Sequence, residues 1–253
     1  PFARDGGGWK SWETLLDENE PKPSSGWYLR SEGMKTWLTG DIPAAEHFVH
    51  ATELWLDEVR TGVGLRRDER SHEEGQLYTF GYIRLAADVS IGFELRGSNL
   101  DASGGLRLGG DGKTARVDSG PGLHMNSASG GCKRLALYCA TPILSEGGGR
   151  LPGIDESGNG TVNGVGIRVV GAAVRSSVLI GGWDMAKQRA KTLRRAIPAG
   201  SVYFAEAASG GLFSEGDIAS LHGIGVSDFT SEQLVKQGFG LILAGTATIR
   251  GAK

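Results

Sequence analysis

A dense group of basic side chains marks the stretch between Gly181 and Arg195, the part of the sequence best suited to bind an anion. The group consists of one tryptophan and five cations, namely Trp183, Lys187, Arg189, Lys191, Arg194 and Arg195. Guanidinium and ammonium groups pair with phosphate oxygens, and an indole ring can stack on a base. This combination is typical of single-stranded RNA binders. A solvated charged loop is the alternative, and these residues alone do not separate the two interpretations.

Residues that could carry out catalysis do not form a constellation. The five histidines lie outside recognised motifs, and His47 and His50 have a spacing of three without a cysteine or carboxylate pattern beside them. No G-x-S-x-G serine motif is present, and Ser201 belongs to a predicted turn that enters a strand. The glycine-rich run from Gly104 to Lys113 lacks the strand–loop–helix context of a phosphate-binding loop. We therefore expect no catalytic residue, no metal site and no cofactor.

Smaller basic groups and a glycine-rich turn complete the predicted RNA contacts. The basic residues are Arg60, Arg66, Arg67, Lys113, Arg116 and Lys236. The turn contributes Gly238, Phe239 and Gly240, between a helix predicted over Thr230–Gln237 and a strand predicted over Leu241–Ile249. Gly238 fits a helix end with positive φ, and Gly240 could start the strand against a ligand or a neighbouring backbone. Alternatively, both glycines serve only the helix-to-strand turn.

The overall charge excludes a globally basic protein. The 27 Lys and Arg residues face 29 Asp and Glu residues, which gives a formal net charge of −2, so contacts with nucleic acid must come from local patches. The 42 glycines among 253 residues have no period, which predicts a loop-rich chain. Cys132 and Cys139 fit no metal motif and are expected on opposite faces of a strand, without a disulfide. Two buried, unpaired cysteines lead us to expect a reducing, cytoplasmic setting. No apolar run is long enough to span a membrane and no signal peptide is visible.

Strand patterns dominate the chain from residue 76 onward. Apolar and β-branched runs bounded by turn residues predict strands over Leu77–Leu85, Val89–Leu95, Leu135–Ile143, Gly166–Val174, Ser177–Ile180, Ser201–Ala205 and Leu241–Ile249. A second helix is predicted over Ser214–Gly223, with Ile218 and Leu221 on one face. In the strand after Ser201, alternation is expected to place Val202 and Phe204 toward the core and Tyr203 on the opposite face.

The stretch Ser145–Gly164 is almost entirely polar or glycine and has no periodicity. This composition predicts a flexible surface loop or linker. We therefore place a soft domain boundary within 146–164, between a domain over 1–145 and a domain over 165–253.

Several short motifs resemble one family. The sequences R-T-G-V-G-L over Arg60–Leu65 and E-G-Q-L-Y-T over Glu74–Thr79 are similar to the paired signature of the third-subunit family of type III-B (Cmr) CRISPR effector complexes, which are RAMP proteins. The L-R-L-G-G run over Leu106–Gly110 resembles that family's L-G-G turn. The segment Arg195–Phe204 resembles its P-A-G-S-V-Y strand entry, and Gln237–Leu241 resembles its glycine-rich loop.

The resemblance implies an α+β fold with two ferredoxin-like (RAMP/RRM-like) βαββαβ units and long Gly-rich loops. One unit would span 1–145 with insertions, and the other would span 165–253 and carry the glycine-rich turn. It also implies a non-catalytic scaffold that grips the 5′ tag of the crRNA and docks the large polymerase/cyclase subunit. Further implied partners are the backbone RAMP subunits and, indirectly, the target RNA.

Two other functions stay open on the sequence. Some RAMP proteins are endoribonucleases that process precursor crRNA by metal-independent acid–base chemistry, and His50 or His72 with Lys113 could act in this way. The net charge of −2 also allows a structural partner that binds protein and never touches RNA.

Overall fold

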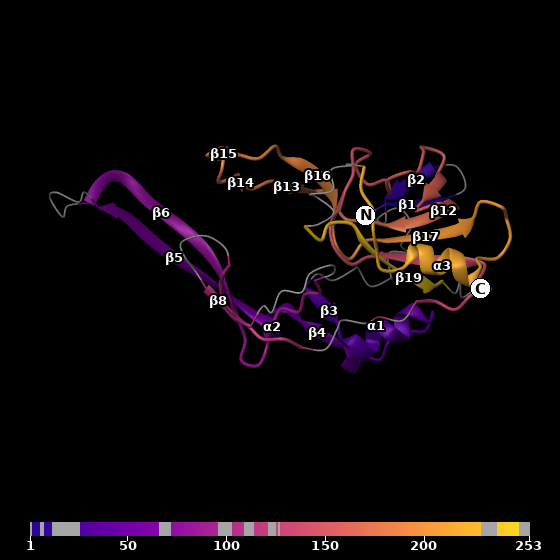
Figure 1. The fold of residues 1–253 in the computed structure, drawn as a ribbon, viewed down its shortest axis with the longest axis horizontal. Coiled ribbons are helices and arrows are strands. Elements are labelled where there is room, and N and C mark those ends of the chain that lie inside the picture. The colour runs from indigo at the N-terminus through magenta and orange to yellow at the C-terminus, as the bar shows by residue number, and fades with distance from the viewer. Residues whose placement is uncertain are drawn as a thin grey trace. The chain divides into compact units, whose positions relative to one another are not determined.

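The chain forms two compact units in a computed structural model (Figure 1). The structure describes residues 2–5, 8–11, 26–65, 72–95, 103–108, 114–120, 125, 127–228 and 237–247. The first unit comprises 1–25, 29–48 and 126–253, and the second comprises 26–28 and 49–125. This division differs from the predicted boundary at 146–164, because residues on both sides of that segment belong to one sheet.

A six-stranded antiparallel sheet organises the first unit. Its strands follow the spatial order β11-β12-β17-β9-β19-β18. Their bounds are β9 (Arg134–Cys139), β11 (Asn159–Val162), β12 (Val165–Ala173), β17 (Val202–Ala207), β18 (Ile224–Gly225) and β19 (Leu241–Thr246). Numbered along the chain, β9, β12, β17 and β19 have the order 4-1-3-2 of a ferredoxin-like unit.

The predicted pair of complete βαββαβ units is not confirmed. The helix α3 (Glu215–Leu221) occupies the second helix position between β17 and β19, but residues 140–164 between β9 and β12 contain no helix. The architecture is a mixed one in which strands predominate over helices, as an α+β assignment requires.

One face of the sheet and α3 enclose the main hydrophobic core. Alternate residues of β12, namely Val165, Ile167 and Val169, are buried, as strand periodicity requires. The helix α3 buries Ile218 and Leu221 as predicted. It begins with a capping box in which the Ser214 side chain accepts the Asp217 N–H at 3.1 Å, and this fixes where the helix starts.

The opposite face of the sheet is partly covered by α1 (Ser31–Leu38). Trp37 contacts the ring of Tyr138 edge-on with centroids 5.8 Å apart. The side chain of Leu38 lies so close to Gly245 that a β-carbon there would be 2.9 Å from its Cδ2 atom. A glycine in this strand therefore allows the helix to approach the sheet closely.

Apolar cover on both faces of the sheet explains why the predicted side-chain orientation in the strand after Ser201 is wrong. Tyr203, expected to face away from the core, is 1% exposed, whereas Val202 and Phe204 are half-buried. The Tyr203 hydroxyl donates a hydrogen bond to the Gly149 carbonyl oxygen. In a central strand, alternation identifies two faces but does not say which one meets the larger core.

The prediction that Ser145–Gly164 is a flexible surface loop is also wrong. The segment contains β11, and Leu151 and Ile154 are buried in the main core. Val89–Leu95, predicted as a strand, forms none. The helix predicted over Thr230–Gln237 lies outside the described residues except for Gln237, which belongs to a turn.

Several short strands complete the first unit. A three-stranded sheet has the order β10-β16-β13, with β10 (Ile143–Leu144), β13 (Val178–Ile180) and β16 (Arg194–Ile197). Between β13 and β16 lies a hairpin of β14 (Trp183–Asp184) and β15 (Arg189–Ala190). We call residues 178–197 the basic arm. A separate antiparallel pair is formed by β1 (Phe2–Asp5) and β2 (Gly8–Ser11).

The second unit is dominated by a long two-stranded antiparallel ribbon of β5 (Trp55–Leu65) and β6 (His72–Leu85), which Figure 1 shows as one extended hairpin. It also contains the pair β7 (Gly104–Arg107) and β8 (Thr114–Val117), and the short helix α2 (Ala51–Leu54). Near the points where the chain passes from one unit to the other, it forms β3 (Trp27–Leu29), the 3-10 helix η2 (Ala45–His47) and β4 (Phe48–His50). Among the described residues, no helix has the length and apolar character needed to cross a membrane.

Candidate nucleic-acid interface

The β14–β15 hairpin positions the densest basic segment of the sequence. Its turn covers residues 185–188, and one carboxylate oxygen of Asp184 accepts the backbone N–H groups of Ala186 and Lys187, each at 3.1 Å. Gln188 closes the turn with a φ of 48°. The Lys191 N–H then donates to the Gly182 carbonyl oxygen at 2.8 Å, which holds the two sides of the arm together.

A hollow of about 450 Å³ opens beside this hairpin. Four cationic side chains contribute to its lining, together with two residues of the glycine-rich turn. These six residues are Lys187, Arg189, Lys191, Arg194, Gln237 and Phe239. The structure thus joins two segments that the sequence presents separately, the basic group and the glycine-rich turn.

The charges of this hollow favour an anion. Among the described residues, Asp184 is the one acidic residue in its lining, and the carboxylate oxygen that holds the turn is already engaged by two amide groups. Four cations around a single carboxylate can bind several phosphate oxygens, and the half-buried Phe239 adds an aromatic surface. The residue types in this lining are those that suit contact with a polyanion.

Two predicted residues of the basic arm do not line the hollow. Trp183 pairs with Ala190 across the hairpin and is 52% exposed. Arg195 is exposed on β16 and points to the face opposite Arg194, because successive residues of a strand alternate. Both remain available to a ligand that extends along the arm.

The glycines of the turn have different environments. Gly238 has a φ of 81° and open space around it, as expected of a residue that ends a turn. Gly240 also has positive φ, and its N–H donates to the Pro142 carbonyl oxygen at 2.9 Å. A β-carbon on Gly240 would lie 2.0 Å from the Val226 carbonyl oxygen, so the close approach predicted there is to a neighbouring backbone.

Among the remaining predicted contacts, Arg60 and Arg116 belong to the second unit and have acidic partners. Arg60 on β5 pairs with Glu58 at 2.5 Å, and Arg116 on β8 pairs with Asp118 at 3.0 Å. Arg66, Arg67, Lys113 and Lys236 lie outside the described residues.

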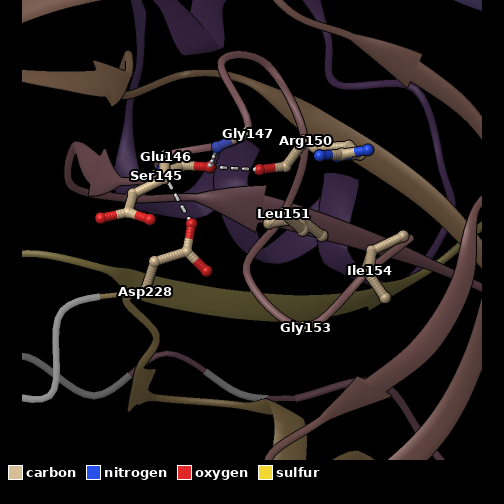
Figure 2. A pocket seen from close by; sticks show the side chains of 8 residues that line it. All are labelled: Ser145, Glu146, Gly147, Arg150, Leu151, Gly153, Ile154 and Asp228. Carbon is tan, nitrogen blue, oxygen red and sulfur yellow. Dashed lines mark hydrogen bonds between the residues drawn. The ribbon is translucent and has the colours of Figure 1, made fainter. Parts of the chain in front are cut away.

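A second pocket, of about 370 Å³, is shown in Figure 2 and was not anticipated from the sequence. The Ser145 hydroxyl donates to the Arg150 carbonyl oxygen at 2.8 Å, and the Glu146 N–H donates to an Asp228 carboxylate oxygen at 2.8 Å. These bonds shape the turn after β10. The pocket has mixed charges, because Arg150 lies opposite two acids, so it is a weaker candidate for RNA. The two large apolar residues Leu151 and Ile154 are the sequence feature that could have indicated a folded segment within the polar stretch.

Several residues that were considered for chemistry have structural roles. His50 caps α2, with its Nδ1 atom 2.9 Å from the Thr52 hydroxyl. The Ser201 hydroxyl donates to the Pro198 carbonyl oxygen at 2.8 Å. Burial raises the pKa of the Cys139 thiol to about 12, which disfavours a thiolate. Both cysteines are free, as predicted. The side chain of His72 and all of Lys113 lie outside the described residues. Within the described part of the chain, no three His, Cys, Asp or Glu side chains come together as metal ligands would.

Comparisons with known proteins address the whole chain. Residues 9–247 match the family model of the CRISPR-associated protein Cas_Cmr3. No curated protein matches. A chain in the cryo-EM structure of the type III-B Cmr-beta complex bound to cognate target RNA and AMPPnP is 16% identical, with a TM-score of 0.39 over 60% of this chain and 47% of that chain. A chain of the complex bound to cognate target RNA is 18% identical, with a TM-score of 0.36 over 60% and 46%. This chain thus aligns with about half the length of each.

Proposed function

Because the chain belongs to the Cas_Cmr3 family of CRISPR-associated proteins, we propose that it is a non-catalytic crRNA-binding scaffold subunit of a type III-B CRISPR interference complex. Its basic arm and glycine-rich turn would hold the RNA backbone. The proposal includes a grip on the 5′ tag of the crRNA and a docking surface for the large polymerase/cyclase subunit. The tag, the docking partner and contacts with backbone RAMP subunits are expectations from family membership.

The observation that carries the proposal is the lining of the hollow. Lys187, Arg189, Lys191 and Arg194 converge there with Phe239 from a segment more than forty residues further along the chain. Like charges repel, and such a convergence is best stabilised by a polyanion. Surface cations with no shared ligand would not need to line one hollow together.

The test is a salt-dependent RNA affinity measurement on the full chain. Arg189→Glu and Lys191→Glu should each weaken binding of a tagged crRNA about tenfold and lower the slope of log affinity against log salt by roughly 0.7 per lost phosphate contact. Lys133→Glu provides the matched control, because Lys133 is an exposed cation outside the lining of the hollow. It should leave affinity nearly unchanged.

Three results would contradict the proposal. Equal losses in the control and hollow variants would mean that only net charge matters. Absence of crRNA crosslinking to the parent chain would favour the purely protein-binding alternative. Specific metal-free cleavage of repeat RNA, lost in a His72→Ala variant, would favour the endoribonuclease. Comparing RNAs with and without the 5′ tag tests the tag grip separately.

A further inference from the structure

The strand β13 is an edge strand of the three-stranded sheet in the basic arm. The sheet has the order β10-β16-β13, so among the described strands β13 pairs with β16 alone. Figure 1 shows the arm projecting from the rest of the first unit. The strand consists of Val178, Leu179 and Ile180, without the proline, lysine or bulge that protects many sheet edges. Residues 175–177 before it are exposed, so a pairing segment can extend past the strand.

The hydrogen bonds of β16 determine which way the backbone groups of β13 point. The Ser145 N–H donates to the Arg195 carbonyl oxygen at 3.3 Å, so the backbone groups of Arg195 face the β10 side. Successive residues of a strand turn these groups to alternate sides, so those of Arg194 and Ala196 face β13. Leu179 is opposite Arg195 in the register. Its N–H and C=O groups therefore point away from β16, toward the open edge.

The side chains beside this edge are apolar on the face turned away from the hollow. Ile180 and Arg194 are opposite each other and line the hollow. Leu179 and Arg195 form the next opposed pair, so their side chains belong to the other face, as does that of Leu193, two residues before Arg195. Leu179 and Leu193 are 63% and 64% exposed. The edge thus combines outward backbone groups with exposed aliphatic surface.

Two cations near this edge have no acidic partner in the described part of the chain. Arg195 and Arg175 are both exposed, and neither forms an ion pair there. Other arginines of the same unit do, because Arg134 and Arg168 pair with Glu206. Aliphatic surface beside unpaired guanidinium groups is complementary to a segment that carries both apolar side chains and carboxylates.

We propose that the open edge of β13 binds an extended segment of a partner protein, which adds to the sheet as a further strand through the backbone groups of Leu179. In this mode of recognition, backbone hydrogen bonds provide affinity and side-chain contacts provide specificity. The segment places an apolar side chain against Leu179 and a carboxylate within reach of Arg195. The inference rests on the proposed function in one respect, that the chain works among other protein subunits. It does not require the hollow to bind RNA.

The chemistry of the edge favours a polypeptide over RNA. An outward N–H and an outward C=O on one residue match the acceptor and the donor of another strand, whereas a phosphodiester offers acceptors only. Leu179 and Leu193 are aliphatic, so they supply neither a stacking ring nor a phosphate partner. The cations suited to phosphate line the hollow on the other face of the arm.

The first test is hydrogen exchange of the full chain, alone and in the complex assembled with the large polymerase/cyclase subunit and the backbone RAMP subunits. The outward amide of Leu179 should exchange rapidly in the free chain. In the complex it should exchange at least about a hundredfold more slowly. Addition of crRNA alone to the free chain should leave this exchange rapid. Slow exchange with crRNA alone would assign the edge to RNA, and rapid exchange in the complex would mean that no strand adds there; either result overturns the inference.

The second test compares variants of the same position. Leu179→Pro removes the outward N–H, and it should leave the arm folded because that group does not join β13 to β16. It should weaken assembly with the other subunits about tenfold, and Leu179→Ala, which keeps the N–H, should weaken assembly less. Leu212→Ala is the matched control, because Leu212 is 61% exposed and lies outside the arm. The control should not affect assembly, and all three variants should keep the crRNA affinity of the parent.

Equal effects of Leu179→Pro and Leu179→Ala contradict strand addition, as do equal effects of Leu179→Ala and Leu212→Ala. The Ile180 amide, which faces β16, reports whether Leu179→Pro keeps the arm folded. If it loses protection, exchange of Leu179 in the parent complex decides the question. If Arg189→Glu weakens crRNA binding while the Leu179 amide stays unprotected in the complex, this inference fails and the proposed function stands. If the amide is protected in a complex whose chain does not contact crRNA, the RNA-binding proposal fails and this inference stands.

Discussion

The backbones of Gly240 and Val226 are in direct contact, with the Val226 N–H donating to the Gly240 carbonyl oxygen at 3.0 Å. A β-carbon on Gly240 would overlap the Val226 carbonyl oxygen. The glycine is therefore required for packing at the start of β19, beside the candidate RNA site. This relationship separates the roles of the two glycines in the turn.

Gly240→Ala should lower the free energy of unfolding by about 3 kcal/mol, because it adds a backbone overlap to the strain of a positive φ. Gly238→Ala should cost only about 1 kcal/mol, since its position has the same kind of φ and open space. Urea unfolding of both variants measures the difference. Equal losses would mean that the Val226 contact yields easily.

The carboxylate of Glu206 joins two neighbouring strands to β17. It accepts hydrogen bonds from Arg134 on β9 and, at 2.6 Å, from Arg168 on β12, and its side chain is 13% exposed. These bonds, chiefly the one from Arg168, lower the pKa of Glu206 below its usual range. Glu206→Gln should therefore reduce the free energy of unfolding at pH 7 by about 1–2 kcal/mol.

The pH dependence of that loss has a definite sign. A carboxyl whose pKa is lower in the folded state stabilises the fold above its unfolded pKa, about 4.3 for glutamate, and the stabilisation disappears as pH falls through the folded pKa. The gap between parent and Glu206→Gln should be full at pH 6–7 and should close in acid. Glu58→Gln is a control with two arginine partners but a more exposed carboxylate, and it should have a smaller effect. A gap that widens in acid would contradict this assignment.

The sequence alone predicts those strands and helices whose pattern involves residues that are close together in the chain. The strand pattern of Gly166–Val174 and the apolar face that Ile218 and Leu221 give to Ser214–Gly223 predict β12 and α3, because both signals depend on near neighbours. The hollow could not be assembled in the same way, because Arg189 and Phe239 meet only through the folded sheet. Composition does not predict the burial of Leu151 and Ile154, because their neighbours are glycine and polar residues. It does not show what a loop packs against.

Burial of Tyr203 on the face opposite to the expected one leads to a separate prediction. Its hydroxyl donates to the Gly149 carbonyl oxygen, and burial raises its pKa. Tyr203→Phe keeps the ring but removes the donor, so it should cost about 1 kcal/mol of unfolding free energy. Tyr203→Leu should cost more, because the smaller side chain leaves a cavity. Thermal unfolding of both variants tests this order, and an unaffected Tyr203→Leu would place the ring outside the core.

Asp184 has two opposing effects on the basic arm. Its carboxylate holds the turn through the N–H groups of Ala186 and Lys187, and its charge opposes an anion in the hollow. Asp184→Asn keeps a side-chain oxygen for the turn and removes the charge. If the hollow binds phosphate, this variant should bind crRNA about threefold more tightly at low salt, an advantage that fades as salt screens the charge.

Asp184→Ala removes the same charge but also the acceptor for both amides, so the turn loses its support and the gain in affinity should disappear. Asp155→Asn is the matched control, because that carboxylate likewise accepts a backbone N–H, from Asn159 at 2.9 Å, but lies outside the lining of the hollow. It should leave crRNA affinity unchanged. Fluorescence anisotropy at several salt concentrations distinguishes the three variants. If Asp184→Asn and Asp155→Asn bind crRNA equally, the charge of Asp184 does not face the RNA, and the hollow is not where phosphates bind.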